Sequence, residues 1–143
     1  VCVADVAVIV GGFMQAGSPQ KARKQQIDMI RADNLYQITS IVDAYYYKTG
    51  TLPPTLASLY QASNDGTGFI DPVTQESYEY TVTSTDRYEL CAVFDGANDV
   101  ESTFNVREPS SLPNFYKHDA GRTCFTVSIL TSPKGPVQPI NIQ

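Results

Sequence analysis

Apolar and polar positions divide the chain into an apolar beginning, a region of helical periodicity and a region of alternating residues. The first seventeen residues, VCVADVAVIVGGFMQAG, are almost all apolar and include one carboxylate, Asp5. Apolar positions then recur at intervals of three and four, which predicts a long amphipathic helix over residues 20–49. The positions expected to face the core are Ile27, Ile30, Asn34, Leu35, Ile38, Ile41, Val42 and Tyr45.

Local residue preferences mark both ends of this helix. Ser18 is a favourable N-cap and Pro19 a favourable first helical residue. Pro19 also breaks the hydrogen-bond ladder of any helix that arrives from the apolar segment, so the chain should kink or restart there. At the other end, Gly50 follows Lys48 and Thr49 and can take the left-handed conformation of a C-cap.

A second pattern, with a period of two, predicts strands. Tyr78, Tyr80 and Val82 alternate with polar residues, and Tyr88–Phe94 alternates in the same way after a turn at Ser84–Asp86. These two segments are expected to form an antiparallel hairpin.

Further elements are expected on either side of the hairpin. A short helix is predicted over Thr55–Tyr60 and a third strand over Cys124–Leu130, which makes a sheet over about residues 77–130. Prolines make residues 131–143 extended rather than helical. The predicted fold class is α+β, with a long N-terminal α-helix, kinked near Pro19, packed on a small antiparallel β-sheet.

The apolar segment has neither the basic residues nor the cleavage site of a secretory signal peptide. At ~1.5 Å per residue a helix of this length reaches roughly 25 Å, short of the about 30 Å hydrocarbon core of a bilayer. It can enter a locally thinned bilayer, or a bundle of helices in which Gly11 and Gly12 allow close backbone packing. We expect residues 1–19 to serve assembly or membrane attachment and residues 20–143 to form a globular domain.

Asp5 needs a partner if the apolar segment is buried, because an unpaired charge away from water is unfavourable. No cationic side chain lies within a helical turn of it, and the nearest positive group is the terminal amine of Val1. One interpretation places Asp5 at a solvated helix end. The other pairs it with the terminal amine of a neighbouring copy, which would set the register of a helix-on-helix polymer.

The charge balance bears on the kind of partner. The 143-residue chain has a formal net charge of -5, and its length suits one compact domain. Phosphate contacts need clustered Lys and Arg, so an acidic chain argues against nucleic acid as a primary ligand. The one basic cluster, Lys21, Arg23 and Lys24, follows the apolar segment and fits a membrane edge better than a nucleic-acid groove.

Two motifs resemble those of type IV pilins and type II secretion pseudopilins. The run YYYKTGTLPPTLASL, residues 45–59, is similar to the end of the family's N-terminal helix and its G-x-x-P-x-x-L-x-x-L motif. The run DPVTQESYEY, residues 71–80, resembles the D-P-x-G-x-x-Y-x-Y that leads into the first strand of the major pseudopilins. Thr74 stands in place of the glycine, and one extra residue precedes Tyr78. The resemblance covers about residues 1–95.

The resemblance implies a pilin-like fold and a structural subunit of an extracellular, type IV pilus-like helical filament on a bacterial surface. Asp5 takes the place of the family's glutamate at that position, and Pro19 lies near its helix-melting proline. The implied partners are further copies of the chain, an inner-membrane pilus assembly machinery and a prepilin peptidase, with the chain in the inner membrane before assembly. Adhesion, motility, DNA uptake and secretion are all compatible with it. The expected self-association residues are Val1, Asp5, Val8, Gly11, Gly12 and Pro19.

Departures from the family pattern leave a second interpretation open. Val1 replaces the usual aromatic residue or methionine, the apolar stretch is shorter than the family's, and a basic cluster follows it. The apolar segment would then be the last transmembrane helix of a longer membrane or secretion-system protein, whose pseudopilin-like domain projects outside the cytoplasm.

The cysteine positions predict a disulfide. Cys91 lies in the second predicted strand and Cys124 at the start of the third, so pairing of adjacent strands can bring them to bonding distance. The bond would contribute on the order of 3 kcal/mol and would place the domain in an oxidising compartment. Two buried free thiols are the alternative. Cys2 is expected to be a buried thiol rather than an intersubunit bond or a lipid attachment site.

Catalytic and metal-binding signals are weak. Asp95, Asn98, Asp99 and Glu101 offer oxygen ligands of the kind that calcium prefers, but their spacing is not that of a known calcium loop, and a solvated acidic turn is the favoured interpretation. The single histidine, His118, is expected on the surface of a loop. Without a phosphate-binding loop or a metal-binding motif, the sequence predicts no enzyme, no catalytic residue, no metal site and no cofactor.

Overall fold

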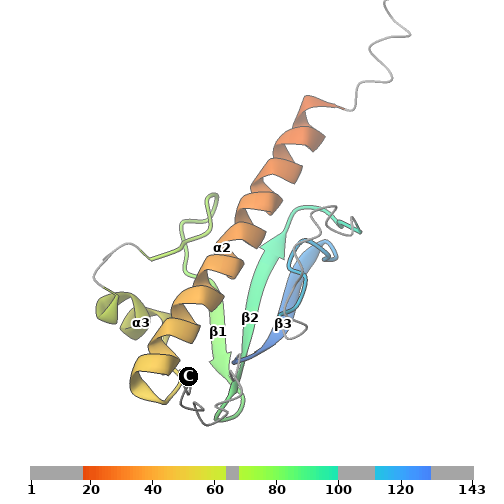
Figure 1. Ribbon diagram of the computed structural model, residues 1–143. Coiled ribbons are helices and arrows are strands. Elements are labelled where there is room, and N and C mark those ends of the chain that lie inside the picture. The colour runs from red at the N-terminus through yellow and green to blue at the C-terminus, as the bar shows by residue number, and fades with distance from the viewer. Residues whose placement is uncertain (1–17, 64–67, 100–111, 130–143) are drawn as a thin grey trace, which may run out of the picture.

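The computed structural model describes residues 18–63, 68–99 and 112–129. A long helix, α2 (Pro19–Thr49), packs along one face of a three-stranded antiparallel sheet, and a short helix, α3 (Leu56–Ala62), lies near the C-terminal end of α2 (Figure 1). The strands β1 (Glu79–Val82), β2 (Arg87–Phe94) and β3 (Gly121–Ser128) follow one another in the order β1-β2-β3. The fold is α+β, and the predicted long helix and antiparallel sheet are confirmed.

The ends of α2 follow the expected local preferences. Ser18 is the N-cap, and its hydroxyl accepts a hydrogen bond from the N–H of Lys21 at 3.3 Å. Pro19 is the first helical residue, while the residues before Ser18, and with them the predicted kink, lie outside the described residues. Gly50 caps the other end with a φ of 78°, and its N–H donates to the carbonyl of Tyr46.

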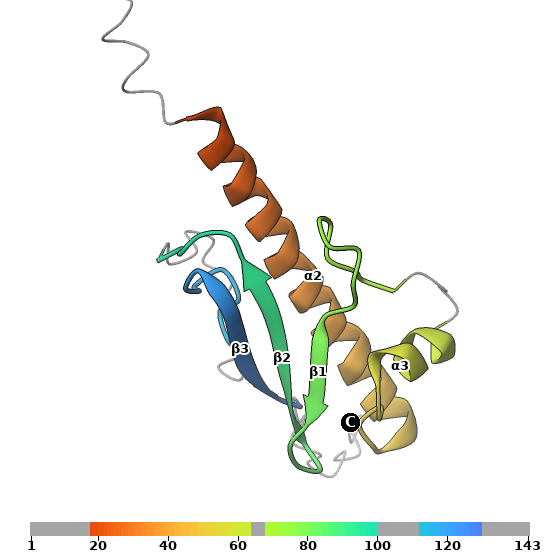
Figure 2. The same cartoon turned by 180° about the vertical axis from the view of Figure 1, so that it is seen from behind.

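The core lies between α2 and the sheet. Every second residue of β2 faces the helix, and the alternating residues of β3 continue this apolar layer. Figure 2 shows the strands lying side by side in front of α2 and running roughly along it, with the opposite face of the sheet turned away from the helix. The buried residues that meet in this layer include Leu35, Ile38 and Val42 of α2, Tyr88, Leu90 and Phe94 of β2, and Phe125 and Val127 of β3.

The buried side of α2 differs from the predicted one in its N-terminal half. Ile30 is 46% exposed, so its assignment to the core was wrong, whereas Asp28 and Arg31 are 5% and 4% exposed. The apolar periodicity missed these two residues because they are charged. In this half of the helix, ion pairs take the place that apolar contacts have farther along.

Two element boundaries were also predicted incorrectly. β3 begins at Gly121 rather than Cys124, because Gly121 still pairs with Phe94, the last residue of β2. Because β3 pairs with the whole length of β2, it also includes residues 121–123, which the apolar–polar alternation did not assign to a strand. The short helix begins one residue later and ends two residues later than expected, with a capping box between Thr55 and Ser58 at its start.

Candidate functional site

The predicted self-association residues lie almost entirely outside the described part of the chain. Pro19 is the exception, and it occupies the first position of α2. Residues 18–26, which follow the apolar segment, are all exposed, and this end of α2 extends beyond the sheet (Figure 1). The predicted residues that belong to the undescribed range 1–17 are Val1, Cys2, Asp5, Val8, Gly11 and Gly12.

The basic cluster lies on this extended end of α2. Lys21, Arg23 and Lys24 are exposed, and no carboxylate among the described residues forms an ion pair with them. These exposed side chains can reach an anionic group outside the described part of the chain.

Arg31 is the centre of a buried polar cluster that joins α2 to two loops. Its Nε and Nη2 donate to the carboxylate of Asp71 at 2.6 and 3.3 Å. Its Nη1 donates to Asp28 and to Asp95, both at 2.9 Å. Asp28 in turn accepts the N–H of Asp95 at 2.9 Å and that of Gly96 at 3.0 Å. One side of α2 thus holds both the turn that begins at Asp71 and the loop that follows β2.

Hydrogen bonds within this cluster favour the ionised forms of Arg31 and Asp71. Burial acts to lower the pKa of Arg31, but its hydrogen bonds to Asp71, Asp28 and Asp95 outweigh burial and raise that pKa above its usual value. For Asp71 burial acts to raise the pKa, and the hydrogen bonds from Arg31 and from two backbone N–H groups lower it below its usual range. Each of the three carboxylates accepts a hydrogen bond from the guanidinium of Arg31. The cluster therefore holds the loops in place and does not resemble a metal-binding site.

Of the four residues considered as calcium ligands, the structure describes Asp95, Asn98 and Asp99. Asp95 pairs with Arg31, and the backbone of Asn98 exchanges hydrogen bonds with that of His118 at 2.8 and 3.0 Å. Asp99 is exposed, and Glu101 lies outside the described residues. In the described part of this loop, Asp95 and Asn98 therefore have structural contacts within the domain.

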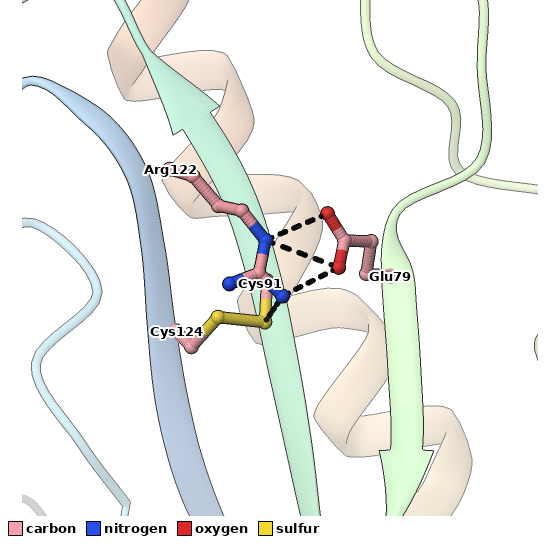
Figure 3. The surroundings of a disulfide bond; sticks show 4 residues. All are labelled: Glu79, Cys91, Arg122 and Cys124. Atoms are coloured by element: carbon pink, nitrogen blue, oxygen red, sulfur yellow. Dashed lines mark hydrogen bonds and ion pairs between the residues drawn. A yellow bond between two sulfur atoms is a disulfide. The ribbon is translucent and has the colours of Figure 1, made fainter.

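The predicted disulfide is present between β2 and β3. Cys91 and Cys124 are register partners, their Cα atoms are 4.0 Å apart, and their sulfurs are bonded on the face of the sheet turned away from α2 (Figure 3). A carboxylate oxygen of Glu89 lies within 4.8 Å of both sulfurs, a grouping of the kind that can hold a metal. Since disulfide sulfurs are not thiolates, this group does not offer metal ligands in the oxidised domain.

His118 is buried, and its predicted surface position was wrong. The residue is 6% exposed, and its ring stacks on that of Phe94, with centroids 3.6 Å apart and an interplanar angle of 12°. The flat imidazole covers the last apolar residue of β2. This structural role could not be read from a histidine in a region without periodicity.

Asp43 and Tyr88 form a polar feature that the sequence did not reveal. A carboxylate oxygen of Asp43 and the hydroxyl of Tyr88 are both buried, and neither has a hydrogen-bond partner among the described residues. Burial and the nearby charge of Asp43 raise the pKa of Tyr88, and burial raises that of Asp43. Asp43 occupies a helix position that, by pattern alone, resembles an ordinary solvated one.

Neither protein-family models, nor curated proteins, nor solved structures give a match to this chain. Within residues 18–63, 68–99 and 112–129, no helix has both the length and the apolar character needed to span a membrane.

Proposed function

We propose that the chain is a structural subunit of a type IV pilus-like helical filament on a bacterial surface, assembled through its N-terminal apolar segment. The observation that carries this proposal is the course of α2, which packs against the sheet from Asp28 onward and continues beyond it as exposed helix (Figures 1 and 2). The chain before Ser18 therefore joins the domain at one end of a long helix, where the sheet does not obstruct contact with other copies.

Exposed apolar residues near this end of α2 support burial against neighbours. Met29 and Ile30 are 53% and 46% exposed and adjoin the helix turns that leave the sheet. Single exposed apolar residues are common, but a helix-on-helix polymer would remove these two from water together with the apolar segment. The pilin-like motifs and the long helix on a small antiparallel sheet agree with this arrangement.

The proposed assembly mechanism uses two kinds of interaction. Packing of apolar segments from many copies supplies most of the binding free energy, because it removes apolar surface from water. The pairing of Asp5 with the terminal amine of Val1 in a neighbouring copy sets the register. The globular domains form the outer layer, and the Cys91–Cys124 disulfide suits an oxidising compartment outside the cytoplasm.

The test of this proposal is the assembly of an Asp5→Ala variant. We expect the variant to yield fewer sedimentable filaments while the domain keeps the circular dichroism of the wild type. A Gln15→Ala variant changes another polar residue of the same segment and should assemble normally. An Asp5→Ala yield equal to that of the wild type would refute the register mechanism.

The exposed basic cluster favours a second candidate function. Lys21, Arg23 and Lys24 directly follow the apolar segment, where their charges attract anionic headgroups at a membrane surface. Such charges by themselves favour the cytoplasmic side of a membrane, but a long domain is translocated largely regardless of them. In this case the chain is the extracytoplasmic, pseudopilin-like domain of a membrane-anchored protein. Mild detergent distinguishes the two functions, because filaments still sediment after extraction whereas an anchored domain is released to the supernatant.

A further inference from the structure

The disulfide and an ion pair share the outer face of the sheet. Glu79 of β1 and Arg122 of β3 reach across β2 and meet above Cys91 (Figure 3). Arg122 Nε lies 3.0 and 3.2 Å from the two carboxylate oxygens of Glu79, and Nη2 lies 2.7 Å from one of them. The same Nη2 is 3.6 Å from the sulfur of Cys91.

This ion pair makes the two sulfurs of the disulfide differ in their accessibility to an attacking thiolate. Cys91, on the central strand β2, is 4% exposed, whereas Cys124 is partly exposed on β3, one of the two edge strands of the described sheet. A thiolate attacks a disulfide along the line of the S–S bond. An approach to Cys91 must come from the side of β1, where Glu79 and Arg122 lie, but an approach to Cys124 comes from the side of β3, on which Cys124 is partly exposed (Figure 3).

We propose that Cys124 is the sulfur at which external thiols and dithiol oxidoreductases exchange with this domain, and that Cys91 is the leaving and resolving sulfur. In the forward step an external thiolate forms a bond to the sulfur of Cys124. The Cys91–Cys124 bond breaks, and its electron pair remains on Cys91 as a thiolate. The external thiol releases its proton to solvent before the attack. Because one S–S bond forms as another breaks, no further oxidant or reductant is consumed.

Arg122 favours this direction of exchange. Its guanidinium contacts the sulfur on which negative charge develops, and a nearby cation stabilises a thiolate. Glu89 lies close to both sulfurs, so it repels an incoming thiolate without choosing between them. The arrangement thus selects Cys91 as the leaving group by charge as well as by access.

The reverse sequence describes how the disulfide is installed. The Cys124 thiolate attacks the disulfide of an oxidised dithiol oxidoreductase and forms a mixed disulfide with it. The Cys91 thiolate, held beside Arg122, then attacks Cys124 and releases the partner as a dithiol. The domain loses two electrons and two protons, and the partner gains them. Neither exchange step requires assembly of a filament.

The test uses the full chain with Cys2→Ser, glutathione as the thiol, a rapid acid quench, alkylation and peptide mapping. We expect the glutathione adduct predominantly on Cys124 and the alkylated free thiol predominantly on Cys91. Equal labelling of the two cysteines, or an adduct predominantly on Cys91, would overturn the proposal.

Two exposed variants separate the role of Arg122 from a general effect of the ion pair. Arg122→Gln removes the cation from Cys91 and should slow formation of the Cys124 adduct about fivefold. Glu79→Gln breaks the same ion pair but keeps the cation, so its rate should equal or exceed that of the parent chain. If Arg122→Gln reacts as fast as Glu79→Gln, Arg122 does not stabilise the leaving thiolate.

Discussion

Arg31 determines how the loops of this domain attach to its long helix. Its planar guanidinium reaches carboxylates from α2, from the turn at Asp71 and from the loop at Asp95, and its side chain is 4% exposed. A buried ion pair gains little over apolar packing of similar volume, but removal of one partner leaves a charge unpaired. The cluster therefore makes the position of two loops depend on a few charged atoms.

Asp71→Asn should reduce the stability of the domain at neutral pH. The amide oxygen can still accept the N–H groups of Val73 and Thr74, but the charge opposite Arg31 is lost. We expect the free energy of unfolding to fall by about 3 kcal/mol, measured by chemical denaturation. Glu76→Gln, an exposed substitution in the same turn, should change it little.

The pH dependence of this difference tests its electrostatic origin. The pKa of Asp71 is lower in the folded state than in the unfolded chain, where it is about 4. Its contribution is therefore present above about pH 4 and is lost as the pH falls through the folded-state value. The difference in the free energy of unfolding between the wild type and Asp71→Asn should become smaller as the pH is lowered from neutral into this range. If this difference does not change with pH, the charge of Asp71 does not contribute to the stability of the domain.

Gln75 carries backbone strain in the turn that Asp71 begins. Its φ is 61°, in the left-handed region that favours glycine. Gln75→Gly and Gln75→Ala both remove the hydrogen bond from its side chain to the carbonyl of Pro72. The glycine variant should be the more stable of the two by about 1 kcal/mol in thermal or chemical unfolding, because only alanine keeps the strain. An alanine variant as stable as the glycine variant would contradict this account.

Single-residue roles were the hardest to predict from the sequence. Asp28 and Arg31 have the polarity of surface residues, and only their mutual pairing with loops forty or more positions away explains their burial. His118 is buried because its ring covers Phe94, a contact that no local pattern encodes. The left-handed residue of the turn is Gln75, one position after the Thr74 that replaces the glycine of the resembled motif.

Elements were predicted more accurately, because periodicity and caps act locally. The bounds of α2 follow from Ser18, Pro19 and Gly50, and the alternation of β2 matches its buried residues. The start of β3 was missed because pairing with β2, rather than any apolar signal, extends it to Gly121. The disulfide was predicted because both cysteines lie in segments that the alternation marked as strands, and the structure pairs these strands in the register that joins Cys91 to Cys124.

The disulfide should stabilise the attachment of β3 to β2. A Cys91→Ala/Cys124→Ala variant loses a link between residues 33 positions apart and should unfold with a free energy lower by about 3 kcal/mol. Chemical denaturation without reductant measures this difference. Under reducing conditions the free energy of unfolding of the wild type should approach that of the variant. If a difference persists after complete reduction, the loss of stability comes from the packing of the sulfur atoms rather than from the disulfide bond.

On the scale of the whole molecule, charge is distributed unevenly along α2. The end that extends beyond the sheet carries Lys21, Arg23 and Lys24, whereas acidic residues outnumber basic ones in the rest of the described chain. The domain therefore presents a basic end, next to the apolar segment, and an acidic body.

Negative-stain electron microscopy of the purified full chain tests the proposed function most directly. The account predicts thin filaments of uniform diameter, built from a core of apolar helices with the globular domains outside. These filaments should persist in mild detergent, because protein rather than lipid buries the apolar segment. Single particles or detergent-soluble membrane patches, without filaments under any assembly condition, would contradict the filament function and favour the membrane-anchored domain.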